Sequence, residues 1–251
     1  MTRYTDEASW VLGLHAVKSA LTQGTAVAEL LVDAKRQDDR IKEVLELAHR
    51  VGIKCRQVKG GVLDELAQKT NHQGVALLLR QQQTQDEPFL KALLKKLEMA
   101  PFLLILDGVQ DPHNLGACLR TADAAGVNAI IAPRDRSVGL TPTVRKVASG
   151  AAETVPFIQV TNLARTLKWL KSEGIWLIGT AEEATQTLYE ADLSGPLAIV
   201  MGGEGKGLRR LTGEQCDLLV KLPMAGSVES LNVSVAGGIS LYEAVRQRGN
   251  V

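Results

Sequence analysis

Cysteine is scarce in this chain of 251 residues, which contains only Cys55, Cys118 and Cys216. The three are odd in number and far apart in the sequence, and none belongs to a Cys-x-x-Cys pair. A disulfide framework or a structural zinc site requires paired or clustered cysteines. The composition therefore argues against both and predicts free thiols in a reducing compartment.

Long apolar runs are also missing. No stretch approaches the roughly 20 consecutive apolar residues that a membrane-spanning helix needs. The first seven residues lack the basic start and the apolar run of a secretory signal. We therefore expect a cytoplasmic protein that has no membrane partner.

A strong excess of one charge is absent as well. The chain has 29 basic and 28 acidic residues, and its formal net charge is +1. This balance provides no overall electrostatic attraction to nucleic acid. Any surface that binds RNA must therefore come from local clusters of arginine and lysine.

The order of apolar and polar segments predicts three parts. Residues 1–80 alternate short apolar runs with helical patterns, as expected for a small α/β domain. Residues 81–100 begin with a polar segment that ends in Pro88 and continue with leucines at helical spacing, which indicates a linker and a connecting helix. Residues 101–251 form a second domain.

The second domain alternates strands and helices throughout. Residues 102–106 form a continuous apolar run, which is typical of a strand buried on both faces. Similar runs at 129–132, 175–178, 197–201 and 218–222 are separated by helical patterns. This alternation predicts an α/β fold with a mostly parallel sheet that is covered by helices on both faces.

Three segments of this domain combine small and polar residues where an apolar strand leads into a helix. They read DPHNLGACLR at 111–120, IVMGGEGKGL at 199–208 and LPMAGSVESLNVSVA at 222–236. Such junctions expose backbone N–H and C=O groups and gather polar side chains at one place. The segments therefore predict a small-molecule site.

The glycine-rich segment does not fit the common nucleotide motifs. A P-loop requires Ser or Thr after its lysine, but Lys206 is followed by Gly207. A dinucleotide fingerprint requires G-x-G-x-x-G, but residues 202–207 read GGEGKG. The segment by itself fits either a tight turn or a close approach of the backbone to a ligand. A Ser-His-Asp site is also excluded, because no histidine follows His113.

The polar residues of these segments also have simple structural interpretations. Asn114 is expected to cap the helix that follows it, and Ser230 is expected to cap the last helix. If Asn114 were helical, it would not share a face with Arg120, since six residues rotate by about 240° around a helix. Arg120 interrupts an otherwise apolar stretch, which favours a specific partner for its side chain.

Together and in this order, the three segments resemble the signature motifs of the SpoU/TrmH class of RNA ribose 2′-O-methyltransferases, within the SPOUT superfamily. The similarity extends from about residue 11 to residue 248. Gly203 stands where the family often has Ala or Ser, and Leu222 stands where it often has Ile. Both changes are conservative for a site that acts through backbone groups.

The resemblance implies the fold and the assembly. Residues 101–251 would form an α/β knot, in which a trefoil-knotted, mostly parallel sheet is flanked by helices. Residues 1–80 would form a smaller α/β domain, similar to ribosomal proteins, that binds the RNA substrate. The family also implies a homodimer with the active site near the subunit interface.

The resemblance further implies the reaction. The enzyme would transfer a methyl group from S-adenosyl-L-methionine to the ribose 2′-hydroxyl of a guanosine in 23S ribosomal RNA or in a ribosomal precursor, without a metal. Two alternatives stay open: a tRNA ribose 2′-O-methyltransferase of the same class, and a catalytically idle factor that binds ribosomal RNA. A dehydrogenase or kinase is disfavoured by the glycine spacing.

Site residues follow from the matching motif positions. By resemblance, the catalytic group comprises Arg120, Asn114, Glu204, Ser230 and Asn232. The residues expected to bind S-adenosyl-L-methionine are Thr180, Gly202, Leu222, Met224 and Leu231. An arginine side chain stays protonated in proteins, so we expect Arg120 to orient the hydroxyl and a phosphate rather than to act as a base.

Local clusters of basic residues are the candidates for RNA contact. Those expected near the catalytic edge are Arg134, Arg136, Arg145, Lys146, Arg209 and Arg210. Those expected on the first domain are Arg36, Arg40, Arg50, Lys54 and Arg56.

Overall fold

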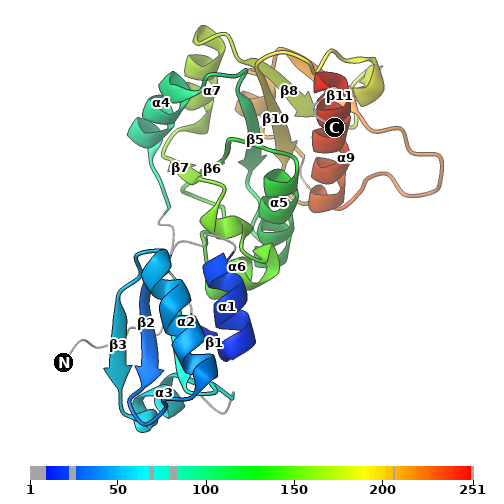
Figure 1. The fold of residues 1–251 in the computed structure, drawn as a ribbon. Helices are drawn as coiled ribbons and strands as arrows, with labels where there is room; N and C mark the ends of the chain where they lie inside the picture. Colours follow the sequence, from blue (N-terminus) through cyan, green and yellow to red (C-terminus); the bar gives the residue numbers. More distant parts are fainter. Residues whose placement is uncertain (1–9, 23–26, 68–70, 80–83, 206, 250–251) are drawn as a thin grey trace. The chain divides into compact units, whose positions relative to one another are not determined.

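The computed structural model describes residues 10–22, 27–67, 71–79, 84–205 and 207–249. The chain divides into two compact units, Met1–Gln81 and Gln82–Val251 (Figure 1). Each unit has its own sheet and its own apolar core. None of the helices in these described ranges combines the length and the apolar character that crossing a membrane requires.

The first unit is a four-stranded sheet with helices. Its strands have the order β1-β4-β2-β3, in which β2 and β3 are parallel and the other pairs are antiparallel. Its elements, in chain order, are β1 (Trp10–Leu12), α1 (Leu14–Thr22), β2 (Val27–Asp33), α2 (Asp39–Arg50), β3 (Cys55–Val58), α3 (Gly60–Ala67) and β4 (Val75–Leu79).

Helix α2 shows why this unit folds as the sequence predicts. Its apolar residues Ile41, Val44 and Ala48 recur at helical spacing, and all three are buried in the core with β2 and β4. Gly52 follows the helix with a φ of 71°, a left-handed conformation that glycine adopts without strain. The sequence pattern also predicts a short helix from Val62 to Lys69; α3 is observed at Gly60–Ala67, and Lys69 lies outside the described residues.

The second unit contains a seven-stranded sheet in which every pairing is parallel. The strand order is β7-β6-β5-β10-β8-β11-β9. The strands are β5 (Phe102–Asp107), β6 (Ala129–Pro133), β7 (Phe157–Val160), β8 (Trp176–Thr180), β9 (Gln186–Thr187), β10 (Leu197–Gly202) and β11 (Leu218–Lys221). The predicted mostly parallel α/β sheet is confirmed.

Helices cover both faces of this sheet. Alternate residues of β5 show the two layers, because Leu104 and Leu106 pack in one apolar cluster and Leu103 and Ile105 pack in the other. The first cluster includes α5, α6 and α9, and the second includes α4 and α7. These helices are α4 (Glu87–Lys96), α5 (Pro112–Ala124), α6 (Pro142–Ala148), α7 (Leu163–Ser172) and α9 (Val233–Arg248), with a short α8 (Arg210–Gly213) and two 3₁₀ turns, η1 (Ala151–Glu153) and η2 (Leu188–Glu190).

The helix expected to connect the two domains is α4, and its packing places it within the second unit. Leu90 is fully buried in the same cluster as α7. The polar segment before α4 also packs against this unit, because Gln85 forms a parallel β-bridge with Ile158 of β7.

Two expected helix caps are wrong. Asp111, not Asn114, caps α5, and its carboxylate accepts a hydrogen bond from the backbone N–H of His113 at 2.8 Å. Pro112 then occupies the first turn, a position that proline favours, so the helix begins before Asn114. Asn232, not Ser230, caps α9, and its side chain accepts from the N–H of Ser234.

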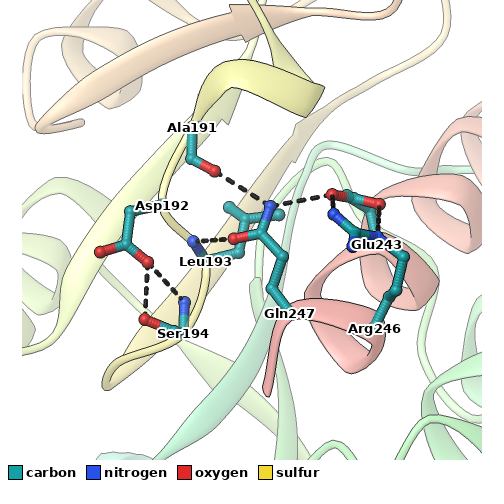
Figure 2. A network of polar contacts seen from close by, with 7 residues as sticks. All are labelled: Ala191, Asp192, Leu193, Ser194, Glu243, Arg246 and Gln247. Carbon is teal, nitrogen blue, oxygen red and sulfur yellow. Dashed lines mark hydrogen bonds and ion pairs between the residues drawn. The ribbon is translucent and has the colours of Figure 1, made fainter. Parts of the chain in front are cut away.

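The C-terminal end of α9 is fastened to the segment before β10 by Gln247 (Figure 2). The Gln247 amide donates to the carbonyl of Ala191 at 3.1 Å and accepts from the N–H of Leu193 at 2.8 Å. Both backbone groups belong to buried residues, so this one side chain satisfies polar groups that water does not reach. Figure 2 also shows Glu243, which joins Gln247 to Arg246.

We predict that Gln247→Ala destabilises the second unit. The substitution leaves a buried N–H and a buried C=O without their partner, at a cost of roughly 1–3 kcal/mol. Urea denaturation would measure the loss. Lys168→Ala is the matched control, because it removes an exposed side chain on α7, and such surface substitutions usually change stability by no more than about 0.5 kcal/mol. Equal stabilities of the two variants would contradict the prediction.

A second prediction concerns acid stability. Hydrogen bonds from Arg246, and secondly from Gln247, lower the pKa of Glu243 from 4.5 to about 2. The ionised carboxylate therefore stabilises the folded state above pH 4.5, and this contribution is lost as the pH falls toward about 2. The thermal midpoint of Glu243→Gln should lie below that of the wild type at about pH 5, and the gap should narrow by about pH 3. A gap that is constant over this range would disprove the assignment.

Candidate active site

The carboxyl ends of β8, β10 and β11 meet at one edge of the second sheet and surround a cavity of about 1030 Å³. Because the pairing is parallel, the loops that follow these strands all emerge at this edge. The cavity is lined by Thr180, Ala181, Glu182, Glu183, Met201, Gly202, Gly203, Glu204, Gly205, Gly207, Leu208, Val220, Lys221, Leu222, Pro223, Met224, Glu229, Ser230, Leu231, Asn232, Val233 and Ala236.

The loop after β10 forms the glycine-rich wall of this cavity. It folds back on itself through an isolated bridge between Gly203 and Gly207. A Cβ atom on Gly202 would lie 2.1 Å from the carbonyl carbon of Gly207, and a Cβ on Gly203 would lie 2.7 Å from the carbonyl oxygen of Gly108. The loop can therefore pack this closely only because Gly202 and Gly203 have no side chains. Lys206, within the loop, lies outside the described residues.

A chain of hydrogen bonds joins the three motif segments. Asn114 Nδ2 donates to Glu204 Oε1 at 2.5 Å, and Asn232 Nδ2 donates to Asn114 Oδ1 at 3.0 Å. Asn232 Oδ1 in turn accepts from the N–H of Ser234 at 2.9 Å and from its hydroxyl at 2.7 Å. Both asparagine amides are thereby held in one orientation, and residues from α5, the glycine-rich loop and the start of α9 act as one unit.

The structure brings most of the predicted site residues together. All five residues expected to bind S-adenosyl-L-methionine line the cavity, and so do Glu204, Ser230 and Asn232. Asn114 is buried and contacts the two lining residues Glu204 and Asn232, so it supports the wall without lining it.

Arg120 is placed differently. It is exposed on α5 and is not among the residues that line the cavity of its own chain. Because Asn114 lies within the helix, the separation of six residues turns Arg120 onto another face. Asn114 and Arg120 therefore do not share a helix face, as expected if Asn114 is helical.

Sequence reasoning missed several charged residues of the cavity. Glu182, Glu183, Lys221 and Glu229 line it in addition to Glu204. The two glutamates at 182 and 183 directly follow the end of β8, so the rule that ligands bind at the carboxyl ends of parallel strands would have found them. Lys221 is the last residue of β11 and carries the same signal, whereas Glu229 carries none.

Two of the three cysteines of the chain lie in the second unit and are unreactive. Burial, with the Glu204 carboxylate nearby, raises the pKa of Cys118 to about 12. Burial, with the Asp217 carboxylate nearby, raises the pKa of Cys216 to about 12. Both thiols therefore stay protonated at neutral pH and pack as small apolar side chains. The described ranges of the chain contain no cluster of three or more His, Cys, Asp or Glu residues suited to a metal ion.

Five of the eleven basic residues proposed to contact RNA form ion pairs. Arg145 pairs with Glu153, Arg209 with Asp107, and Arg210 with Glu214. In the first unit, Arg36 pairs with Asp38 and Arg56 with Glu29. The other six candidates are exposed, as are the paired Arg56, Arg209 and Arg210; the six are Arg134, Arg136, Lys146, Arg40, Arg50 and Lys54.

This arrangement is that of an α/β protein that binds a small ligand in a crevice beyond the carboxyl ends of parallel strands. The family model described as "SpoU rRNA Methylase family" matches residues 101–242, and the one described as "RNA 2'-O ribose methyltransferase substrate binding" matches residues 10–85. The chain therefore belongs to the SpoU rRNA methylase family.

Known relatives span almost the whole chain. A Shewanella oneidensis protein named 23S rRNA (guanosine-2'-O-)-methyltransferase RlmB is 56% identical over 239 residues, which cover 95% of this chain and 97% of that protein. The SpoU methyltransferase AviRb from Streptomyces viridochromogenes, solved with AdoMet, is 24% identical with a TM-score of 0.73 and shares the fold over 98% of this chain and 92% of its own. An AdoMet-bound rRNA methyltransferase from Sinorhizobium meliloti is 25% identical with a TM-score of 0.71, over 96% of this chain and 87% of that one.

We predict that Gly202→Ala disrupts the glycine-rich loop. The new methyl group would overlap the backbone of Gly207, and overpacking of this kind costs roughly 1–3 kcal/mol or more. Thermal denaturation would measure the effect. Gly226→Ala is the matched control, because no atom lies within 4 Å of its added Cβ. A Gly202→Ala variant as stable as Gly226→Ala would show that the loop can rearrange freely.

Proposed function

We propose that this chain transfers a methyl group from S-adenosyl-L-methionine to the ribose 2′-hydroxyl of a guanosine in 23S ribosomal RNA. The observation that carries the proposal is the hydrogen-bonded chain of Glu204, Asn114 and Asn232, which joins all three family motifs at the edge of the cavity. A protein named for this reaction is 56% identical over 95% of this chain, which supports the substrate and the enzyme class.

The cavity suits S-adenosyl-L-methionine. Its volume of about 1030 Å³ exceeds what a nucleoside-sized ligand needs, and ligand pockets typically measure about 300–1,000 Å³. Gly202 and the loop after it leave backbone groups uncovered by side chains, and Leu222, Met224 and Leu231 add apolar surface. These residues, together with Thr180, would hold the nucleoside part.

The charge of the cavity also suits this cosubstrate. Four glutamates line it, against one lysine among its described residues, and they favour a ligand with positive charge. When bound, S-adenosyl-L-methionine supplies an activated methyl group on a positively charged sulfur, so the protein needs no metal to activate the methyl.

The side chains of this protein would then position the ribose. Asn232 and Ser230 lie at the cavity wall, where they would hold the 2′-hydroxyl, and Asn114 and Glu204 would fix the orientation of Asn232. Arg120 would orient the hydroxyl and a neighbouring phosphate of the RNA through the N–H donors of its guanidinium. Catalysis by such a site consists mostly of positioning.

We propose that the active form is a homodimer. Helix α9 exposes Val235 and Tyr242, each 50% exposed, and Ile239 lies between them at helical spacing. Arg120 projects from α5, which packs beside α9 (Figure 1). In the homodimer a second copy would cover this apolar stripe. The exposed Arg120 of one copy would then lie at the cavity of the other copy, since it does not line the cavity of its own chain.

The domain roles and the topology follow the family. We propose residues 1–80 as the domain that binds the RNA substrate, residues 81–100 as the connection, and residues 101–251 as the methyltransferase domain with a trefoil knot. The knot is proposed from the family alone. We also propose a cytoplasmic location, which a ribosomal RNA or ribosomal-precursor substrate supports.

The decisive experiment measures methyl transfer from labelled S-adenosyl-L-methionine to unmodified 23S, 16S and transfer RNA, followed by mapping of 2′-O-methyl groups. We expect one 2′-O-methylguanosine in 23S RNA. Arg120→Ala should lower the rate by about 100-fold or more, the scale of a lost positioning contact. Arg165→Ala on α7, an exposed arginine on the opposite face of the sheet, should retain activity.

The other outcomes discriminate between the candidate functions. Methyl label in transfer RNA would agree with the proposed mechanism but would show that the proposed substrate is wrong. Tight binding of ribosomal RNA without any binding of S-adenosyl-L-methionine would identify an idle assembly factor instead.

A further inference from the structure

Asp107 is a carboxylate buried at the end of β5. The residue is 2% exposed, and its side chain has no exposed surface. A buried carboxylate is costly unless hydrogen bonds and an opposite charge compensate for the lost water. Its partners are therefore informative about what the residue does.

Among the described residues, Arg209 donates all the hydrogen bonds that the Asp107 carboxylate accepts. Oδ1 accepts from Arg209 Nε at 2.6 Å and also from Nη2, and Oδ2 accepts from the backbone N–H of Arg209 at 3.1 Å. The contact thus fixes both the guanidinium and the main chain of Arg209. Lysine could not reproduce this fork of donors.

The position of the pair gives it a specific role. Asp107 lies directly opposite Gly202 in the parallel ladder of β5 and β10, and Gly202 begins the glycine-rich loop. Arg209 ends that loop and caps α8. The ion pair therefore ties the last residue of the loop to the strand position beside its first residue.

The loop held in this way is a wall of the cavity. Between its two ends, Gly203, Glu204, Gly205, Gly207 and Leu208 all line the cavity, whereas Asp107 and Arg209 do not. The pair therefore acts on a ligand only through the loop.

We infer that the Asp107–Arg209 ion pair is a positioning device that holds the glycine-rich loop in the shape that binds S-adenosyl-L-methionine. The inference rests on the proposed function for the identity of the ligand. It also gives Arg209 a role other than the direct contact with RNA that its basic neighbours suggest.

The first readout needs no ligand. Amide hydrogen exchange of the loop between Gly202 and Arg209 should become faster in Arg209→Lys and in Asp107→Asn than in the wild type. Arg210→Ala is the matched control, because it removes the adjacent arginine, whose partner Glu214 is exposed and lies outside the loop. Its loop amides should exchange at the wild-type rate. Unchanged exchange in both Arg209→Lys and Asp107→Asn would overturn the inference.

The second readout is calorimetric binding of S-adenosyl-L-methionine. We expect Arg209→Lys to weaken binding roughly tenfold or more, to raise the KM for this cosubstrate, and to leave kcat at saturation within about threefold, because a bound ligand restores the loop. Arg210→Ala should bind S-adenosyl-L-methionine with the affinity of the wild type. Wild-type affinity in Arg209→Lys, together with weaker binding of ribosomal RNA, would assign Arg209 to RNA contact instead.

A double-mutant cycle tests the pairing itself. Arg209→Gln leaves the buried carboxylate without its opposite charge, and adding Asp107→Asn removes that charge. The double variant should therefore lose no more affinity than the worse single variant. Additive losses would show that the residues act separately.

Thermal midpoints separate positioning from folding. Arg209→Lys and Asp107→Asn should remain folded, and unfolding of both would overturn the inference in favour of a general structural role. If the wild type fails to bind S-adenosyl-L-methionine, the proposed function falls, but the hydrogen-exchange comparison still decides whether the pair holds the loop.

Discussion

The parallel pairing of β5 with β10 is the constraint on which the rest of the second unit depends. The ladder runs from Leu197 opposite Phe102 to Gly202 opposite Asp107. Both strands are buried on both faces, so a shift of one residue would exchange the two sets of core side chains. The register therefore fixes where the chain leaves the sheet after each strand. This in turn brings Asp107 at the end of β5 against Arg209, and Asn114 in α5 against Glu204 of the glycine-rich loop.

Helix α9 is held at both ends, while the segment before it is open. Asn232 fastens its first turn to α5 through Asn114, and Gln247 fastens its last turn to the backbone near Leu193. Between β11 and α9, Ser227, Val228 and Glu229 are exposed. The strand ends and the glycine-rich wall of the cavity are therefore fixed, and its third side is exposed. A ligand can enter from that side without disturbing the apolar core.

Much of the fold was predictable from local patterns, and the errors have physical causes. The apolar run from Phe102 and the helical spacing of Ile41 and Val44 predicted a buried strand and an amphipathic helix, and both are present. The helix caps were wrong because both asparagine and serine can cap a helix, and Asp111 followed by Pro112 is a better start than Asn114. The glutamates at 182 and 183 were missed because charged residues are usually solvated, and this expectation outweighed their position after the carboxyl end of β8.

The sequence by itself determined the alternation of strands and helices, the parallel class of the second sheet and the family, because burial repeats along the chain with the periods of strands and helices and because the three motifs are local. Only the tertiary structure decided which polar groups meet. Asn114 reaches Glu204 across 90 positions and Asn232 across 118, and Arg209 reaches Asp107 across 102. Such contacts depend on the order and register of the strands, which no local pattern encodes, and so the role of each side chain at the cavity was set only when the sheet was assembled.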